Sequence, residues 1–163
     1  MSKKYFTWIP AFLFMCIIFS FSNKTATEST KSSSFITRSI LNTYEKVFQV
    51  DLTEDEYSNI SDKLETVVRK MAHMCEYAVL TILVFIHLVC CEVPLKKCLW
   101  IALLVAVMYA ATDEFHQRFV AGRSCELRDV LIDSIGSTLG GISFYFVMKW
   151  KDRRNIKRER LSN

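Results

Sequence analysis

The sequence of 163 residues is poor in the residue patterns that mark several common kinds of site. It has only four glycines, and they form no nucleotide-binding loop, so no segment points to a nucleotide-dependent enzyme. Its six cysteines form no CxxC pair and lack the spacing of zinc ligands, which leaves them most simply as small hydrophobic residues. No internal repeat is visible either, which argues against a repeat architecture.

Charged residues are also scarce within four long blocks of the chain. The blocks cover residues 5–21, 71–91, 98–111 and 130–150, and they hold most of a hydrophobic content of 51%. Because a helix needs about 20 apolar residues to cross a bilayer, the first block qualifies outright. The second and fourth qualify if His73, Glu76 and Asp133 are tolerated near their ends, and the third qualifies only if residues 112–117 continue its helix. A soluble helical bundle is the alternative, but the blocks show little amphipathic alternation.

We therefore predict an all-α integral membrane bundle of four transmembrane helices. Residues 1–22 form the first span, and no convincing small-residue cleavage site follows it, which argues against a removed signal peptide. Residues 23–68 form an external amphipathic segment between the first and second spans. Residues 69–149 form a core of three helices, and residues 150–163 form a basic cytoplasmic tail.

The external segment carries helix signals of its own. Its apolar residues recur at helical spacing, namely Ile36, Ile40, Tyr44, Val47 and Phe48. This spacing predicts an amphipathic helix that lies on the membrane surface. Thr53 followed by Glu56 resembles a capping box, and either Ser61 or Asp62 is expected to begin the helix of the second span.

The distribution of basic residues predicts the orientation in the membrane. Pro94 indicates a tight turn between the second and third spans, and Gly122 a turn before the fourth. The net charge is +4, and the basic residues near the predicted cytoplasmic ends are Lys3, Lys4, Lys96, Lys97 and those of the tail. An even number of spans places these segments on one face, so both termini are predicted to be cytoplasmic. The tail is expected to contact the lipid bilayer rather than nucleic acid.

The opposite face is not free of basic residues. It carries Arg69, Lys70, Arg118, Arg123 and Arg128. It also carries Cys75 and Cys125, and the sequence does not decide whether these two cysteines form a disulfide.

Acidic side chains of three different spans are expected to share one layer of the membrane. At 1.5 Å per residue, Glu76 and Asp113 lie about 22 Å, and Asp133 about 24 Å, above the cytoplasmic ends of their helices. The hydrocarbon core is about 30 Å thick, so this layer lies a little inside the outer boundary. About one turn higher come His73, His116 and Asp129, and the basic residues lie above them.

The helix faces agree with this depth. His73, Glu76 and Tyr77 are spaced i, i+3, i+4 on the second span, and Asp113, His116 and Gln117 repeat that spacing on the third. Asp129 and Asp133 share a face of the fourth span, and Gly136 and Gly140 continue that stripe as a small-xxx-small pattern for close helix packing. These residues are expected to form one inward cluster that pairs its own charges, because each would be costly against lipid.

The cluster predicts a site. The candidate catalytic residues are His73, Glu76, Asp113, His116 and Asp133, and the candidate ligand-binding residues are Lys70, Tyr77, Gln117, Arg123 and Asp129. Either histidine is suited to act as a general base, with Glu76 or Asp113 to orient it. Arg123 and Lys70 are suited to hold a phosphate or carboxylate.

Ordinary structural roles are alternative interpretations of several of these residues. His73 and Glu76 also fit an ordinary helix-end pair, Asp129 fits an N-cap, and Glu114 is expected to point away from the cluster into solvent. No comparable polar residues continue through the cytoplasmic halves of the spans, so a proton or ion path across the membrane is not indicated. Histidine and carboxylates are adequate metal ligands, so metal binding stays open, and the residues specify no cofactor or oligomeric state.

Three motifs in order resemble the VanZ-like family of small bacterial membrane proteins. They are Lys70-x-x-His73-x-x-Glu76-Tyr77, then Asp113-Glu114-x-His116-Gln117 with Arg123, then Asp129-x-x-x-Asp133-x-x-Gly136, within residues 69–141. Several family members have asparagine where this chain has Asp133. Because the family consists of bacterial membrane proteins, the resemblance implies a multi-pass protein of the bacterial cell membrane. The family's namesake is associated with resistance to the glycopeptide antibiotic teicoplanin. The resemblance also implies a cell-envelope role with a lipid-linked or cell-wall ligand, and it does not specify a reaction.

Overall fold

The computed structural model describes all residues except 1–3, 5, 124–125 and 163. The described residues form five α-helices and no strand: α1 (Ile9–Ser22), α2 (Ala26–Phe48), α3 (Glu54–Cys90), α4 (Leu95–Gln117) and α5 (Leu127–Ser162). The prediction of an all-α fold is confirmed. Cys125 lies outside the described residues, and Cys75 is a free, exposed cysteine.

Three of the helices, α3, α4 and α5, are long and apolar enough to cross a membrane. The polar residues 112–117 do continue α4, which extends this helix to 23 residues. The fourth apolar helix, α1, is shorter than the block that predicted it, with 14 residues, or about 21 Å. It begins at Ile9 because Pro10, which has no backbone N–H to donate, is favoured in the first helical turn.

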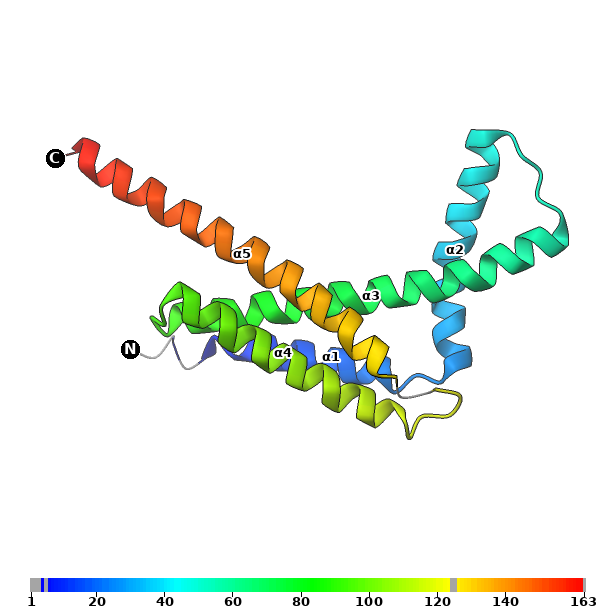
Figure 1. Cartoon of the computed structure of the whole chain (residues 1–163), viewed down its shortest axis with the longest axis horizontal. Coiled ribbons are helices and arrows are strands. Elements are labelled where there is room, and N and C mark those ends of the chain that lie inside the picture. Colours follow the sequence, from blue (N-terminus) through cyan, green and yellow to red (C-terminus); the bar gives the residue numbers. More distant parts are fainter. Residues whose placement is uncertain (1–3, 5, 124–125, 163) are drawn as a thin grey trace.

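Helices α1, α3, α4 and α5 run back and forth between two ends of one bundle (Figure 1). The N-terminus and the α3–α4 turn lie at the same end, where Lys4 Nζ is 2.6 Å from Glu92 Oε1. The hydrogen bond from Lys4, and then its charge, lower the pKa of Glu92. The turn itself falls between Cys90 and Leu95 next to Pro94, as the sequence predicted.

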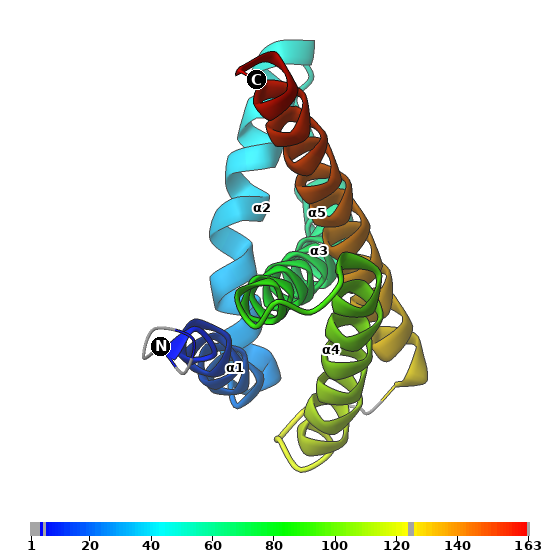
Figure 2. The same ribbon diagram turned by 90° about the vertical axis from the view of Figure 1, so that its left-hand side faces the viewer.

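Helix α2 leaves the bundle at a steep angle (Figures 1 and 2). It begins with a capping box between Thr25 and Glu28, and α3 begins with the predicted capping box between Thr53 and Glu56. Leu41 of α2 is buried, but most of the helix's large apolar side chains are exposed: Phe35, Ile36, Ile40, Tyr44, Val47 and Phe48. The predicted amphipathic helix therefore exists, and its apolar side chains have no complete cover in the protein.

The second predicted helix start was wrong. Helix α3 continues through Ser61 and Asp62 as one helix of 37 residues. The cap at Thr53 already starts it, and no proline or glycine interrupts residues 54–90.

Small residues bring the helices of the bundle close together. A Cβ atom added at Gly140 would lie 2.7 Å from the backbone oxygen of Ala78, and one added at Gly136 would overlap the backbone of Met74. Helix α5 therefore packs on α3 through these two glycines, in the way the small-xxx-small pattern indicated. Helix α4 has a corresponding stripe of buried small residues four apart: Cys98, Ala102, Ala106 and Ala110.

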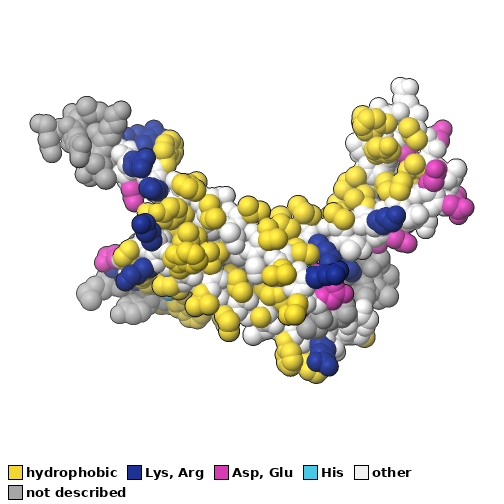
Figure 3. Space-filling view, in the orientation of Figure 1, with side chains coloured by type: hydrophobic (Ala, Val, Ile, Leu, Met, Phe, Trp, Pro, Cys, Tyr) yellow, Lys and Arg dark blue, Asp and Glu magenta, His cyan; other side chains and the backbone are white. Residues whose placement is uncertain are grey.

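On the face shown in Figure 3, hydrophobic side chains are spread over much of the bundle, and many of the lysines and arginines lie toward its two ends. On α4 and α5, Trp100 is 72% exposed and Leu131 63% exposed. Such a surface fits a lipid environment, because large apolar residues contact hydrocarbon without cost there.

The glycine contacts lead to a prediction in which packing and helix propensity oppose each other. Gly136→Ala and Gly140→Ala are each expected to lower the stability of the purified protein by about 1–3 kcal/mol, because the new methyl group meets backbone. Propensity alone favours alanine by about 1 kcal/mol. Thermal unfolding in detergent measures the difference.

Gly141→Ala is the matched control in the same helix. Its Cβ would meet the end of the Leu99 side chain at 3.0 Å rather than backbone, so a smaller loss is expected. A rise in melting temperature for the first two variants would contradict the proposed mode of packing.

Candidate functional site

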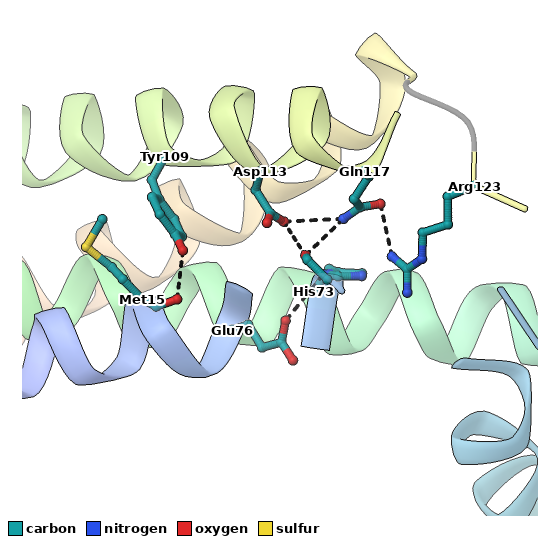
Figure 4. Close-up of polar contacts among 8 residues, drawn as sticks. Met15, His73, Glu76, Tyr109, Asp113, Gln117 and Arg123 are labelled. Atoms are coloured by element: carbon teal, nitrogen blue, oxygen red, sulfur yellow. Dashed lines mark hydrogen bonds and ion pairs between the residues drawn. The ribbon is translucent and has the colours of Figure 1, made fainter. Parts of the chain in front are cut away.

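Asp113 anchors a buried hydrogen-bond network at the end of the bundle where α1 and α4 finish (Figure 4). Ser22 Oγ donates to Asp113 Oδ2 at 2.6 Å, and Gln117 Nε2 donates to the same oxygen at 3.3 Å and to Ser22 Oγ at 3.1 Å. Arg123 Nη1 donates to Gln117 Oε1 at 3.0 Å. The α4–α5 loop is thereby connected to α4 and to the last residue of α1.

His73 and Glu76 of α3 face this network (Figure 4). His73 Nδ1 lies 3.3 Å from Glu76 Oε2, but neither atom has a hydrogen-bond partner of good geometry. Asp133 of α5, 6% exposed, is among the charged groups that act on His73, and so is Arg123. The structure therefore brings His73, Glu76, Asp113 and Asp133 together from three helices.

Two further contacts tie α5 to its neighbours. Lys70 Nζ donates to Asp129 Oδ1 at 2.7 Å, which links α3 to the first turn of α5. Glu114, only 4% exposed, accepts a hydrogen bond at 2.9 Å from the backbone N–H of Glu126, directly before α5. The expectation that Glu114 points into solvent was wrong, because the chain folds back over it to begin α5. Asp129 lies inside the helix and pairs with Lys70, so it is not the N-cap.

Part of this cluster lines a polar cavity of about 100 Å³. Its lining residues are Arg69, Lys70, His73, Glu114, Gln117, Gly122, Arg123, Asp129, Ile132 and Asp133. Gly122 has a φ of 77°, a conformation that favours glycine, and this turn directs Arg123 back toward the bundle. Partial burial, and then the neighbouring charge of Arg69, lower the pKa of the Arg123 guanidinium, which remains protonated at any physiological pH.

Four predicted site residues lie outside the lining of this cavity: Glu76, Tyr77, Asp113 and His116. His116 turns toward α1, where its Nε2 lies 2.8 Å from Asn23 Oδ1 and its ring packs on Phe19 at 4.6 Å between centroids. Tyr77 is fully buried beneath the cavity, and its hydroxyl has no hydrogen-bond partner of good geometry among the described residues. Asp113, Asp133 and Tyr109 are the ionisable groups around it.

The arrangement offers acid–base and anion-binding groups in one partly enclosed space. A histidine with an adjacent carboxylate is suited to take up a proton, and apo contacts of this kind are commonly loose until a ligand binds. In the described part of the chain, no three His, Cys, Asp or Glu side chains are placed to hold a metal ion.

A comparison with protein families decides the affiliation of the chain. A family model described as VanZ/LLP1 matches residues 7–149. The chain belongs to the VanZ/LLP1 family. Among curated proteins and solved structures, none matches it.

The family match extends well beyond the three motifs of residues 69–141, because it includes α1 and α2 of the VanZ/LLP1 chain. The structure gives a reason for part of this extent: Ser22, the last residue of α1, hydrogen-bonds directly to Asp113. A site built only from α3, α4 and α5 would leave Asp113 without this donor.

Three residues at the site were missed by the sequence reasoning. Ser22 gave no signal, because one serine at a helix end is unremarkable. Glu114 had one: it lies four residues after Ala110 and so continues the buried alanine stripe of α4. Arg69 appeared only as a basic residue of the outer face, although it lines the cavity.

The burial of Glu114 gives a second prediction. Glu114→Leu removes the acceptor for the Glu126 N–H and is expected to lower stability by about 1–3 kcal/mol, the cost of an unsatisfied buried group. Glu114→Gln keeps an acceptor oxygen and is expected to retain most of the stability. Thermal unfolding and amide hydrogen exchange at Glu126 measure both effects. Equal exchange rates in the two variants would contradict the contact.

Proposed function

We propose that this VanZ/LLP1 protein is a multi-pass protein of the bacterial cell membrane whose polar cavity binds or acts on a cell-envelope ligand, such as a lipid-linked molecule. In this proposal α1, α3, α4 and α5 all cross the bilayer, α2 lies at the outer membrane surface, and both termini are cytoplasmic. The cavity then lies near the outer boundary of the membrane. Helix α1 has only 14 residues. It can still cross the bilayer if the residues before it add to its length and the bilayer thins locally around it.

One observation carries the proposal: charged and acid–base side chains from three apolar helices surround a cavity instead of only pairing with one another. A purely structural cluster would satisfy its groups completely, since each unpaired charge is expensive in such surroundings. Among the described residues, His73 Nδ1, Glu76 Oε2, Asp113 Oδ1 and Arg123 Nε are buried atoms without hydrogen-bond partners. His73 and Arg123 also line the polar cavity, so these two groups are within reach of a ligand there.

The residues have separable roles in this function. His73 is placed to accept a proton from a ligand, and Glu76 to stabilise the resulting imidazolium. Asp113, held by Ser22 and Gln117, fixes the position of Gln117, which in turn holds Arg123. Asp133 presents a second carboxylate to His73 from the opposite helix.

A second function rests on the fully paired contacts. Lys70 with Asp129, and Glu114 with the Glu126 N–H, are the contacts expected of charges that hold helices together. In this alternative the protein is a non-catalytic membrane factor in the envelope or antibiotic response, and the cluster is structural. Teicoplanin susceptibility, suggested by the family's namesake, is the cellular readout for both functions.

The proposed topology predicts the side on which two surface positions react. A variant with Cys91 as its only cysteine places the thiol in the α3–α4 turn, and a cysteine-free chain with Ala121→Cys places it in the α4–α5 loop. A membrane-impermeant maleimide added to intact cells should label Ala121→Cys and not Cys91. Permeabilised cells supply the control, since both should then react. The reverse pattern on intact cells would overturn the orientation.

The site proposal predicts loss of function without loss of stability. His73→Ala, Glu76→Ala and Arg123→Ala are expected to abolish the cellular phenotype while melting temperature changes little, because each side chain keeps a buried polar atom without a partner among the described residues. Arg118→Ala is the matched control: Arg118 is exposed, lies five residues before Arg123 and lines neither described cavity. It should leave both readouts unchanged.

The structural alternative predicts the opposite coupling. Melting temperature would fall in step with function in all three alanine variants. Lys70→Asp alone would lower both melting temperature and function. Adding Asp129→Lys would restore both, because the double variant rebuilds the 2.7 Å contact with the charges reversed. Parallel loss and parallel rescue would replace the site proposal with the structural one.

A further inference from the structure

Two guanidinium groups meet at one wall of the site. Arg69 of α3 and Arg123 of the α4–α5 loop both line the polar cavity, and Arg69 is among the charges that act on Arg123. Two like charges in a partly buried space repel each other, so their proximity favours an anion between them. Among the described residues, no ion pair shorter than 4.0 Å includes either arginine.

Three of the acids nearby are engaged with other groups. Asp113 accepts from Ser22 and Gln117, Glu114 accepts from the Glu126 N–H, and Glu76 lies against His73. Lys70, which the sequence paired with Arg123 as an anion-binding residue, is already bound to Asp129. Arg123 uses Nη1 on Gln117, while its Nε is buried and has no partner among the residues that the structure describes. Arg69, rather than Lys70, is thus the cation that complements Arg123.

The same two arginines also line a second cavity, of about 240 Å³. It lies where the end of α1, the first half of α2 and the middle of α3 converge. Its apolar lining residues are Phe21, Ile36, Val68 and Ala72. The shared wall between the two cavities consists of Arg69, His73 and Arg123.

The second cavity opens to the surface. Phe21 and Ile36 are 43% and 49% exposed, so part of the cavity wall faces outward, where the bundle carries its apolar side chains. An apolar chain placed in this cavity can therefore continue into surrounding hydrocarbon. A molecule that spans both cavities needs an anionic group beside a hydrophobic chain.

We propose that the ligand is a lipid carrying a phosphate, with the phosphate between Arg69 and Arg123 and the adjoining hydrocarbon chain in the apolar cavity. The proposal rests on the proposed function, since it names the ligand class of the same site. Guanidinium groups bind phosphate through paired charge-assisted hydrogen bonds, which suits two arginines on one wall. The phosphate lies directly beside His73, within reach of the acid–base groups.

Binding of a fluorescent phosphatidic acid to the purified full-length protein tests this directly. A phosphate-free maltoside detergent avoids competing phospholipid, and a diacylglycerol with the same chains and fluorophore reports binding by the chains alone. The phosphatidic acid should bind at least about tenfold more tightly, since charge-assisted hydrogen bonds from arginine to phosphate are among the strong ones. Equal affinity for the two lipids would overturn the phosphate assignment.

Variants separate the two halves of the binding site. Arg69→Gln and Arg123→Gln should each weaken phosphatidic acid binding about tenfold or more and leave diacylglycerol binding unchanged. Ala72→Phe, which fills the apolar cavity, should weaken both lipids. Arg118→Gln is the matched control and should bind as wild type. Arg69→Lys and Arg123→Lys keep the charge and serve if a glutamine variant does not fold; they should weaken binding by a smaller factor.

Two outcomes contradict the inference specifically. Wild-type affinity in Arg69→Gln and Arg123→Gln would remove the arginines from the site. Displacement of the lipid by inorganic phosphate at concentrations similar to those of unlabelled phosphatidic acid would show that free phosphate, not a lipid, is the ligand.

Failure of this inference is distinguishable from failure of the proposed function. If phosphatidic acid does not bind but His73→Ala still abolishes the cellular phenotype at unchanged melting temperature, the site stands and its ligand is of another class. If phosphatidic acid binds as expected but the phenotype survives every alanine variant, the lipid site stands and the proposed cellular function fails.

Discussion

The cost of placing charge among apolar helices constrains the whole arrangement of this protein. A single ionised side chain at the centre of a bilayer costs about 2.5–3.5 kcal/mol on insertion scales, and less toward the boundary. This chain collects Glu76, Asp113, Glu114 and Asp133 in one region with His73 and Arg123. Such a group is tolerable only if the helices bring donors and opposite charges to each acid. Ser22 and Gln117 donate to Asp113, the Glu126 N–H donates to Glu114, and His73 Nδ1 lies 3.3 Å from Glu76 Oε2.

Close helix packing makes this compensation possible. Gly136 and Gly140 let α5 approach the backbone of α3, and Cys98 and three alanines form the inward face of α4. Along α4 the same buried face changes from Ala110 to Asp113 and Glu114. The bundle thus has an apolar part, tightly closed by small residues, and a polar part at one end, where longer side chains leave a cavity. The site lies where the packing changes from small to polar residues.

The polar residues fall into two groups by how completely they are paired. Lys70 with Asp129, and Glu114 with the Glu126 N–H, are closed contacts that hold the start of α5 against α3 and α4. Within the described part of the chain, His73, Glu76 and Arg123 each keep a buried atom without a partner, and Arg69 is in no ion pair. The paired residues fit a role in holding the helices together, and the residues with unpaired atoms fit a role in ligand binding. Both readings of the sequence therefore describe parts of the same cluster.

Helix periodicity and chain breaks are local properties, and the sequence by itself determined what depends on them. It determined the all-helical fold, the cap at Thr53, the turn at Pro94, the glycine stripe of α5 and the shared faces of His73 with Glu76 and of Asp113 with Gln117. Contacts between side chains depend on which helices become neighbours and on the direction in which each loop returns, and neither is encoded within one helix. Only the tertiary structure could therefore place Ser22 against Asp113, turn His116 toward Asn23, bury Glu114 under the start of α5 and assign Lys70 to Asp129. For the same reason it alone set Arg69 beside Arg123, because these residues are far apart in the chain and meet only when the α4–α5 loop folds back over α3.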